Sequence, residues 1–263
     1  VLRVETEVEK GEQQIIDKIV NGINQVKDDN TVAVGVSVPG QVDIVTKDIL
    51  VCVNINFKNI PLGKIIKEKC GLDIEINNDA NVAALAEGVM GAAKDVDMSY
   101  FITWSTGIGG GLVINKKLIS GKNIYSGEVG NVIVDPSSTY VHSIQTQGAV
   151  EGITSGTALK RFAEELGYAH AGELIQAYKD GNEDAIKIID KVADNFARLI
   201  ATILHVVEVD MFVLGGGVTI KSGDVLLPLV KEKVDQYVMP IMRGKIIIKE
   251  AELGEDAGII GSA

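Results

Sequence analysis

Three short motifs in the chain carry residues that could phosphorylate an alcohol. The first is the Asn-Asn-Asp-Ala-Asn run at 77–81, the second is the glycine-rich run from Ser105 to Gly111, and the third is Gly-Glu-Val-Gly-Asn at 127–131. A carboxylate can orient an attacking hydroxyl and accept its proton. Glycines let backbone N–H groups approach phosphate oxygens closely. Together the three motifs predict phosphoryl transfer to a hydroxyl group.

Asp79 is the candidate base of the first motif. It follows an expected strand and opens an expected helix, so its side chain should lie at the carboxyl edge of a sheet, where open α/β folds bind ligands. The alternative is that Asp79 only caps the helix, because Asp and Asn are favoured at helix N-caps. Asn77 and Asn78 weaken this alternative, since one cap residue is enough. The sequence leaves both interpretations open.

Two glycine clusters are candidate nucleotide-binding segments. The Ser105–Gly111 run lacks the Gly-Lys-Ser/Thr of a Walker A loop, and a meander rather than a helix is expected after it. A glycine-rich hairpin without a ligand is therefore the alternative for this run. The second cluster, Gly215-Gly216-Gly217, follows a buried strand, where flat backbone would suit an adenine or a ribose. A simple left-handed turn would need only one glycine there.

Two glutamates could add to a sugar-binding set. Glu128 lies between glycines, and Glu151 precedes a Ser-Gly-Thr run. Carboxylates accept hydrogen bonds from neighbouring hydroxyls, so these two residues and Asp79 could grip a sugar if they converge. A solvated surface position is the default for either glutamate.

The elements that must position these residues alternate between helix and strand. Apolar spacing predicts helices over 15–23, 62–70, 80–90, 155–166, 183–207 and 225–238, and strands over 32–38, 49–53, 73–76, 100–104, 111–114, 132–134, 211–214 and 245–249. This alternation predicts an α/β protein with two lobes and a central cleft. We expect a smaller lobe over 1–97 and a larger lobe over 98–263, with the last helix returning to the smaller lobe.

Composition excludes several other classes of protein. A chain of 263 residues that is 46% hydrophobic can bury a large core. Its formal charge of -11 and the absence of a Lys/Arg cluster argue against a nucleic-acid surface. The two cysteines make no disulfide framework or metal motif, and no apolar run approaches the ~18 residues of a membrane span. We therefore expect a cytoplasmic protein that contacts neither nucleic acid nor membrane.

These motifs, in this order, resemble the ROK family of sugar kinases and sugar-responsive repressors. The resemblance is carried by segments 38–43, 54–62, 78–81, 105–111, 127–130, 151–158, 214–218 and 253–258. It implies an actin-like ATPase (ribonuclease H-like) fold, with ATP and Mg²⁺ between two lobes and a hexose in the cleft. The resemblance also implies a homodimer.

The same resemblance implies roles for individual residues. Asp79 corresponds to the general base, and the implied sugar ligands are Asn78, Glu128 and Glu151, with Gly40 and Asn54 as weaker candidates. The implied nucleotide-binding residues are Thr106, Gly107 and Gly109 at the phosphates and Gly215, Gly216 and Gly217 at the adenosine.

The chain departs from the family pattern in its metal site. Asn131 stands where the family has a histidine, and 140–150 contains no cysteine. Since His142 alone cannot complete a tetrahedral site, we expect no structural zinc. The loop must then be held by packing or be mobile.

The ends of the chain depart from the family as well. The Asp-x-Gly-Gly-Thr phosphate motif is absent before Leu2, and Ala263 stops within an expected helix, so we expect a longer parent chain.

The function favoured by these residues is ATP-dependent phosphorylation of a hexose, at the 6-hydroxyl of glucose or a related sugar. Two alternatives stay open. One is a sugar-sensing repressor of the same family whose DNA-binding domain precedes this chain. The other is a sugar-binding protein that has lost catalysis, for which Asn131 and the missing zinc motif are the support.

Overall fold

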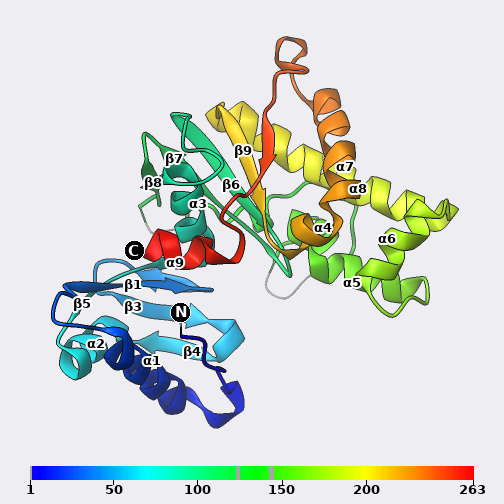
Figure 1. Ribbon diagram of the computed structural model, residues 1–263. Helices are drawn as coiled ribbons and strands as arrows, with labels where there is room; N and C mark the ends of the chain where they lie inside the picture. The colour runs from blue at the N-terminus through cyan, green and yellow to red at the C-terminus, as the bar shows by residue number, and fades with distance from the viewer. Residues whose placement is uncertain (1, 123–124, 142–144) are drawn as a thin grey trace.

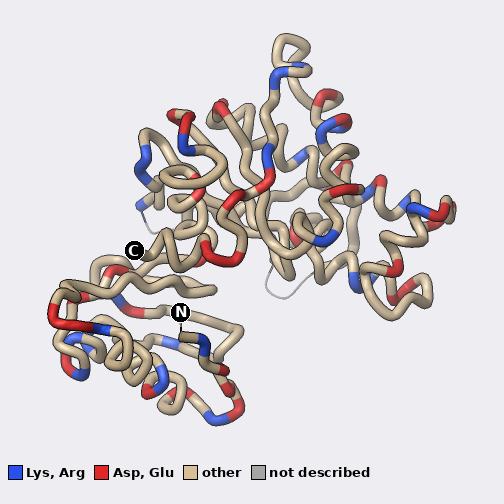
Figure 2. Tube along the Cα trace, in the orientation of Figure 1, with Lys and Arg blue, Asp and Glu red and all other residues tan. Residues whose placement is uncertain are grey.

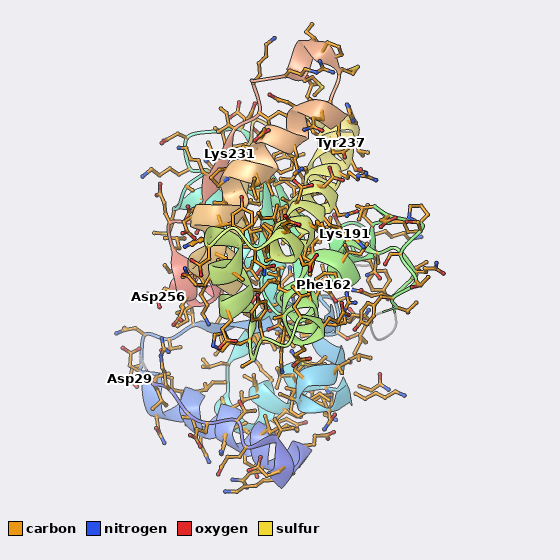
Figure 3. The ribbon with its side chains drawn as sticks, turned by 90° about the vertical axis from the view of Figure 1, so that its right-hand side faces the viewer. Asp29, Phe162, Lys191, Lys231, Tyr237 and Asp256 are labelled. Carbon is orange, nitrogen blue, oxygen red and sulfur yellow. The ribbon has the colours of Figure 1, made fainter. Side chains whose placement is uncertain are left out.

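The computed structural model describes residues 2–122, 125–141 and 145–263, which form a smaller and a larger part (Figure 1). The smaller part contains the N-terminal helices and strands, and the larger part contains the long helices α7 and α8. The last helix, α9 (Ala257–Ser262), lies between the two parts and contacts both α3 (Asp79–Val89) and β1 (Ala33–Val38). In the perpendicular view, Asp29 marks the smaller part and Phe162 the larger (Figure 3).

The smaller part is built on two small sheets. Strand β1 pairs in parallel with β5 (Asp73–Asn78), and β2 (Gln41–Asp43), β3 (Asp48–Cys52) and β4 (Phe57–Ile60) form an antiparallel sheet. The other elements of this part are η1 (Val8–Lys10), α1 (Glu12–Val26), η2 (Val53–Ile55) and α2 (Leu62–Cys70). Val38 is in register with Asn78, so the carboxyl ends of β1 and β5 lie side by side. This pairing brings Gly40 next to the 77–81 motif.

The larger part is built on a mixed sheet with the order β10-β9-β6-β7-β8. Its strands are β6 (Met98–Trp104), β7 (Ile108–Ile114), β8 (Lys117–Ile119), β9 (Met211–Gly215) and β10 (Ile248–Glu250). Strands β6, β9 and β10 are parallel, while β7 runs antiparallel to β6. The β7–β8 turn places Asn115 and Lys116 at positive φ, as in the two-residue hairpin turns that match strand twist.

Helices cover both faces of this sheet because apolar side chains of its strands point alternately to one face and to the other. Tyr100, Ile102 and Trp104 belong to a core cluster that includes residues of α7 (Glu183–Val207) and α8 (Gly217–Tyr237). The Trp104 ring is fully buried and stacks on Phe196 of α7, with ring centroids 3.8 Å apart. Phe101 faces the other way and packs in a separate cluster with Ala84 of α3. Residues at the carboxyl ends of β6 and β9 therefore lie between α3 and the long helices.

The remaining elements are mostly helical and connect the strands. They are η3 (Val129–Asn131), α4 (Val150–Thr154), α5 (Gly156–Glu165), α6 (Ala171–Lys179), η4 (Pro240–Met242) and η5 (Gly254–Asp256). Basic and acidic residues are interspersed over both parts, and several acidic residues lie on the segment that leads into α9 (Figure 2). No helix in the described part of the chain is long and apolar enough to cross a membrane.

The structure differs from the expected elements in several places, among them β7, which begins at Ile108 rather than at 111, and α6, β2 and β4, which were not expected. Helix α8 begins at Gly217, eight residues before the expected Val225, because Gly216 with φ of +91° serves as its N-cap. The 132–134 segment makes only an isolated bridge between Ile133 and Ala149 rather than a strand. The last strand lies at 248–250 rather than 245–249. The division into lobes at 97 and 98 stays a prediction.

Candidate active site

Asn78 caps the helix that begins at Asp79. Asn78 is the N-cap of α3, and its Oδ1 accepts hydrogen bonds from the backbone N–H groups of Ala80 (2.9 Å) and Asn81 (3.4 Å). Asp79 is the first residue of the helix, and its Oδ1 accepts from Ala80 N–H at 2.9 Å. Asn78 therefore supplies the N-cap, while the Asp79 carboxylate at the helix start shares the Ala80 N–H with it.

Asp79 lines a cleft of about 210 Å³ between α3, the ends of β6 and β9, and the segment before α9. Other residues of this cleft include Ala80, Ala83, Thr103, Gly215, Gly216, Thr219, Glu250, Ala251, Gly254 and Gly258. Desolvation raises the pKa of the Asp79 carboxyl above its ordinary value, and the N–H of Ala80 opposes this shift only in part. A carboxylate with a raised pKa is a better proton acceptor than an ordinary aspartate.

Gly215 and Gly216 give this cleft a wall of bare backbone. A Cβ on Gly216 would lie 2.6 Å from the carbonyl oxygen of Trp104, so a side chain cannot be accommodated there. Gly217 is the first residue of α8, whose N-terminus carries unpaired N–H groups and the positive end of the helix dipole. An anionic phosphate is the ligand that such a terminus favours.

The 105–111 run consists of a tight loop and a strand. Ser105 N–H donates to Gly107 O at 3.0 Å, and Thr157 Oγ1 donates to Thr106 O at 2.8 Å, which anchors the loop to α5. Gly109 and Gly111 lie inside β7, where a Cβ would come within 3.1 Å of Ala80 and 2.5 Å of Ala84 respectively. Close packing of α3 therefore accounts for these two glycines, and a role of Gly109 at the phosphates stays a prediction.

The Glu151 carboxylate contacts the end of this loop at Gly107 and Ile108. Its Oε2 accepts from the N–H of Ile108 at 2.6 Å, and its Oε1 accepts from the Gln145 side-chain amide at 2.6 Å. Helix α4, which carries Glu151, is fixed in turn by the indole N–H of Trp104, which donates to Thr154 O at 2.6 Å. The side chain is thus held by protein donors, with one lone pair of each oxygen left for a ligand.

The three carboxylates predicted to bind sugar are linked by electrostatics, and their convergence on one sugar site stays a prediction. The pKa of Glu128 is raised by desolvation and then by the negative charges of Glu151 and Asp79. Charges act on one another in this way only when they are close. Glu128 is exposed, immediately before η3.

The weaker sugar candidates lie on the side of the smaller part. Asn78 Nδ2 donates to Gly40 O at 3.2 Å. A Cβ on Gly40 would lie 2.3 Å from Val51 O, which places Gly40 against the end of β3, and Asn54 follows in η2 two residues after Cys52. The charge of Asp79 raises the pKa of the buried Cys52 thiol, after the larger effect of desolvation. Gly40, Asn78 and Asp79 therefore belong to one neighbourhood, and Asn54 leaves the strand beside it.

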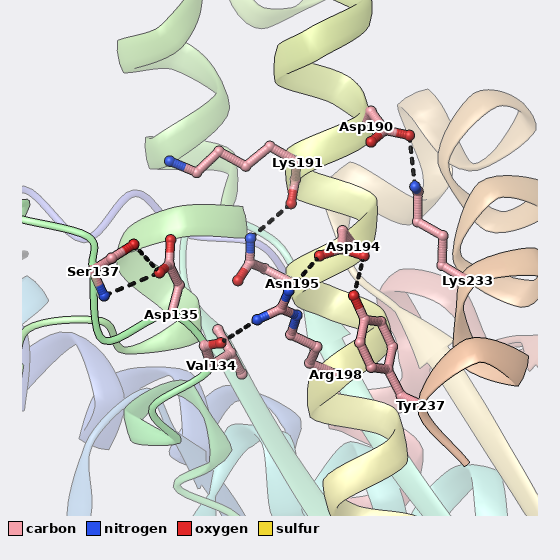
Figure 4. A network of polar contacts seen from close by, with 10 residues as sticks. All are labelled: Val134, Asp135, Ser137, Asp190, Lys191, Asp194, Asn195, Arg198, Lys233 and Tyr237. Carbon is pink, nitrogen blue, oxygen red and sulfur yellow. Dashed lines mark hydrogen bonds and ion pairs between the residues drawn. The ribbon is translucent and has the colours of Figure 1, made fainter.

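The segment 132–150 lies between Glu128 and Glu151 in the chain. Polar contacts hold its described residues near Val134 and Asp135 (Figure 4). Arg198 of α7 donates from Nη1 to Val134 O at 3.2 Å and pairs with Asp194 at 3.1 Å, while Tyr237 O–H donates to Asp194 at 2.5 Å. The Arg161 guanidinium lies 3.7 Å from the centre of the Tyr140 ring. These contacts support the expectation that packing holds this loop, at least over its described residues.

The zinc expectation cannot be decided from these contacts. His142, the one candidate ligand, lies outside the described residues. Within residues 2–122, 125–141 and 145–263, no group of three His, Cys, Asp or Glu side chains could hold a metal ion. The absence of a structural zinc therefore stays a prediction.

Several site residues were not singled out from the sequence. Thr103 and Glu250 line the cleft, Gln145 binds Glu151, and Glu87 binds the segment before α9. Thr103 could have been found from its position near the end of a strand at the carboxyl edge of the sheet. Glu87 and Glu250 gain their neighbours from distant parts of the chain, and a sequence pattern carries no signal of that, whereas Gln145 lies only six residues before Glu151.

Comparisons with known proteins agree with this geometry. The model of the ROK family matches residues 2–263. A glucokinase from Thermotoga maritima is 32% identical, over 98% of this chain and 87% of its own length. The crystal structure of a ROK hexokinase from Thermus thermophilus matches with a TM-score of 0.88 and 26% identity, over 99% of this chain and 87% of the other. A ROK family glucokinase from Streptomyces griseus, in complex with glucose and AMPPNP, matches with a TM-score of 0.81 and 25% identity, over 100% and 89%.

Proposed function

The chain belongs to the ROK family and has its actin-like ATPase fold, and we propose that Asp79 is the general base in the ATP-dependent hexose phosphorylation that this sugar kinase performs. The observation that carries this proposal is the place of Asp79. It opens α3, whose N-cap is Asn78, and lines the same cleft as Gly215 and Gly216.

The proposed mechanism is mostly positioning. The hexose hydroxyl donates a hydrogen bond to the Asp79 carboxylate, which accepts the proton as the oxygen bonds to the terminal phosphorus of ATP, while the bond from that phosphorus to the bridging oxygen breaks and ADP leaves. We propose that the loop at Thr106 and Gly107 supplies N–H groups to the phosphates, and that Gly215, Gly216 and Gly217 at the start of α8 face the adenosine. Because these donors are fixed by the fold, they need little reorganisation during the reaction.

The cleft suits Mg²⁺ as the partner of the nucleotide. Magnesium binds through one or two carboxylates together with phosphates and water. Asp79 and Glu250 are the carboxylates that line the cleft, so this donor set fits an ion held chiefly by the phosphates. When bound, the ion would neutralise phosphate charge, while Asp79 still has to accept the hydroxyl proton.

The sugar pocket is proposed on the other side of Asp79. Asn78, Glu128 and Glu151 surround it, with Gly40 and Asn54 at its edge. Several acceptors around one space suit a substrate with many hydroxyl groups. We propose glucose or a related hexose as the substrate and its 6-hydroxyl as the acceptor, because the primary hydroxyl is the least hindered nucleophile of the ring.

The kinase is better supported than a repressor of the same family. The glucokinase relative matches 98% of the chain, and a ROK glucokinase bound to glucose and AMPPNP shares its structure. We also propose a cytoplasmic homodimer. Both cysteines, Cys52 and Cys70, are free and buried, which suits a reducing compartment.

A substrate panel tests the proposed function. Full-length protein with ATP and Mg²⁺ would be given glucose, mannose, fructose and N-acetylhexosamines, with ADP release as the readout. We expect sugar-dependent ADP release with at least one hexose and none without sugar. Isothermal titration with an ATP analogue separates the alternatives, because a protein that only binds sugar would show no nucleotide heat. ADP release that no hexose stimulates would contradict the kinase assignment.

A further inference from the structure

Glu87 is a buried carboxylate that the proposed mechanism does not use. It is 1% exposed and lies near the C-terminal end of α3, the helix that begins at Asp79. Ionised groups are rarely buried unless hydrogen bonds compensate the loss of water. Its partners therefore show what its burial achieves.

Three backbone N–H groups point at the Glu87 carboxylate from two segments of the chain. Oε2 accepts from Ala92 at 2.9 Å and from Glu252 at 3.2 Å, and Oε1 accepts from Leu253 at 2.8 Å. The first partner belongs to the turn that ends α3. The other two follow β10, about 165 positions further along the chain. Glu87 thus joins α3 to the segment that leads into α9.

The turn after α3, which contains Gly91, packs closely against the Glu87 carboxylate. A Cβ on Gly91 would lie 2.2 Å from Glu87 Oε2. Lys116 donates to the carbonyl oxygens of Gly88 (2.9 Å) and Lys94, so the end of α3 is fixed from a second side. The turn is therefore closed around the glutamate.

The segment that Glu87 holds forms a wall of the cleft. Glu250, Ala251, Gly254, Ala257 and Gly258 line the cleft opposite Asp79. Ala83, four residues before Glu87 on the same helix face, lines it as well. One face of α3 therefore carries the proposed base at its start and the attachment of the nucleotide-side wall near its end.

From this arrangement we infer that Glu87 is a positioning residue that sets the distance between Asp79 and the bound nucleotide. The carboxylate locks the 250–258 segment to the helix that carries the base. This inference rests on the proposed function. It differs from a general stabilising role because its loss should act on the nucleotide side of the reaction.

Glu87→Gln is the most informative variant, since it preserves shape and removes one acceptor. All three partners are N–H donors, so the amide NH₂ must face at least one of them. If the glutamine oxygen takes the place of Oε2, it still accepts hydrogen bonds from the N–H groups of Ala92 and Glu252. Its NH₂ group then faces the N–H of Leu253, and that hydrogen bond is lost. A displacement of about 1 Å near reacting groups can lower a rate about 100-fold. We expect kcat/KM for ATP to fall about 10- to 100-fold, with the KM for hexose changed less than about twofold.

The control must lose stability without touching the cleft. Leu174→Ala removes a fully buried side chain of α6 in the core of the larger part. It should lower the Tm as much as Glu87→Gln or more, with the KM for both substrates unchanged. Titration of an ADP analogue into each protein, followed by calorimetry, reports nucleotide binding without turnover, and weaker binding is expected for Glu87→Gln alone.

The outcomes distinguish this inference from the proposed function. If the wild-type protein neither binds the nucleotide nor phosphorylates any hexose, the proposed function fails. If the wild type is active and Glu87→Gln matches Leu174→Ala in both KM values and in nucleotide affinity, the inference about Glu87 is wrong. An equal rise in the KM for hexose and for ATP would also overturn it.

Discussion

Asp79→Asn should separate catalysis from stability. A positioned general base contributes about 10²- to 10⁴-fold to the rate, which corresponds to about 3–5 kcal/mol of the activation barrier. The amide cannot accept the hydroxyl proton, so kcat should fall by that factor. Binding should change little, because asparagine has the same shape and Asn78 still caps α3.

The stability of this variant follows from the direction of the pKa shift. The pKa of Asp79 is raised in the folded protein, so the ionised carboxylate disfavours folding at neutral pH. This cost is present above the folded pKa and disappears as the pH falls below the unfolded value. Asp79→Asn should therefore keep the wild-type Tm or exceed it near pH 7, and this difference should vanish in acid.

The assay compares kcat, both KM values and the Tm with those of a matched control. Asp73→Asn changes an exposed aspartate at the start of β5, the strand that leads into Asp79. Asp73 forms an ion pair with Lys67 at 2.9 Å. It should leave kcat unchanged. For the wild type, the acid limb of kcat/KM should lie above the ordinary aspartate pKa of 3.8, because deprotonation of Asp79 is required. Near-normal kcat in Asp79→Asn, or a loss of Tm that parallels the loss of activity, would refute this reasoning.

Three further changes test other parts of the site. Glu151→Gln should lower the pKa of Glu128, which the Glu151 charge helps to raise, and should raise the KM for hexose; a carboxyl titration by NMR that finds Glu128 unchanged would show that the two are not close. Gly111→Ala should lower the free energy of unfolding by about 1–3 kcal/mol, because its Cβ forces β7 away from α3. Gly22→Ala in α1 should raise the free energy of unfolding by up to about 1 kcal/mol. Urea unfolding in which both variants change it in the same direction would contradict the packing. Arg198→Met should speed amide exchange over 132–141, the stretch that contains Val134, and unchanged exchange there would mean that other contacts hold it.

The sequence predicted Asp79 but could not decide its role. The Asn-Asn-Asp turn and the helix after it are local patterns, and both are present in the structure. Which of Asn78 and Asp79 caps the helix depends on side-chain torsions and on Gly40 O, which accepts a hydrogen bond from Asn78 and lies between β1 and β2. Local spacing carries no information about such a partner.

The glycines show a second limit of sequence reasoning. The sequence around Gly109 and Gly111 would also fit a phosphate loop. In the structure both residues lie in β7, and they must be glycines because Ala80 and Ala84 of α3 pack closely against them. Gly217 looks like part of a loop and instead begins α8. A glycine permits close approach, but only the tertiary structure decides whether a helix or a ligand approaches it.

Glu87 shows the third limit. Its residue type predicts a surface position, since glutamate is almost never fully buried. Two of its partners, Glu252 and Leu253, lie in a segment far along the chain that the fold brings to α3. Long-range pairing of this kind cannot be read from periodicity, whereas the two-lobed alternation of helices and strands depends on local patterns and was predictable.

The most direct test of the central claim is product analysis with ATP, Mg²⁺ and the best hexose of the panel. Mass spectrometry and ³¹P NMR would follow wild-type protein and Asp79→Asn side by side at matched folded concentration. The account predicts a hexose monophosphate and one equivalent of ADP from the wild type, and at least a ~100-fold slower yield of both from the variant. Equal rates from the two proteins, or ADP without a phosphorylated sugar, would contradict it.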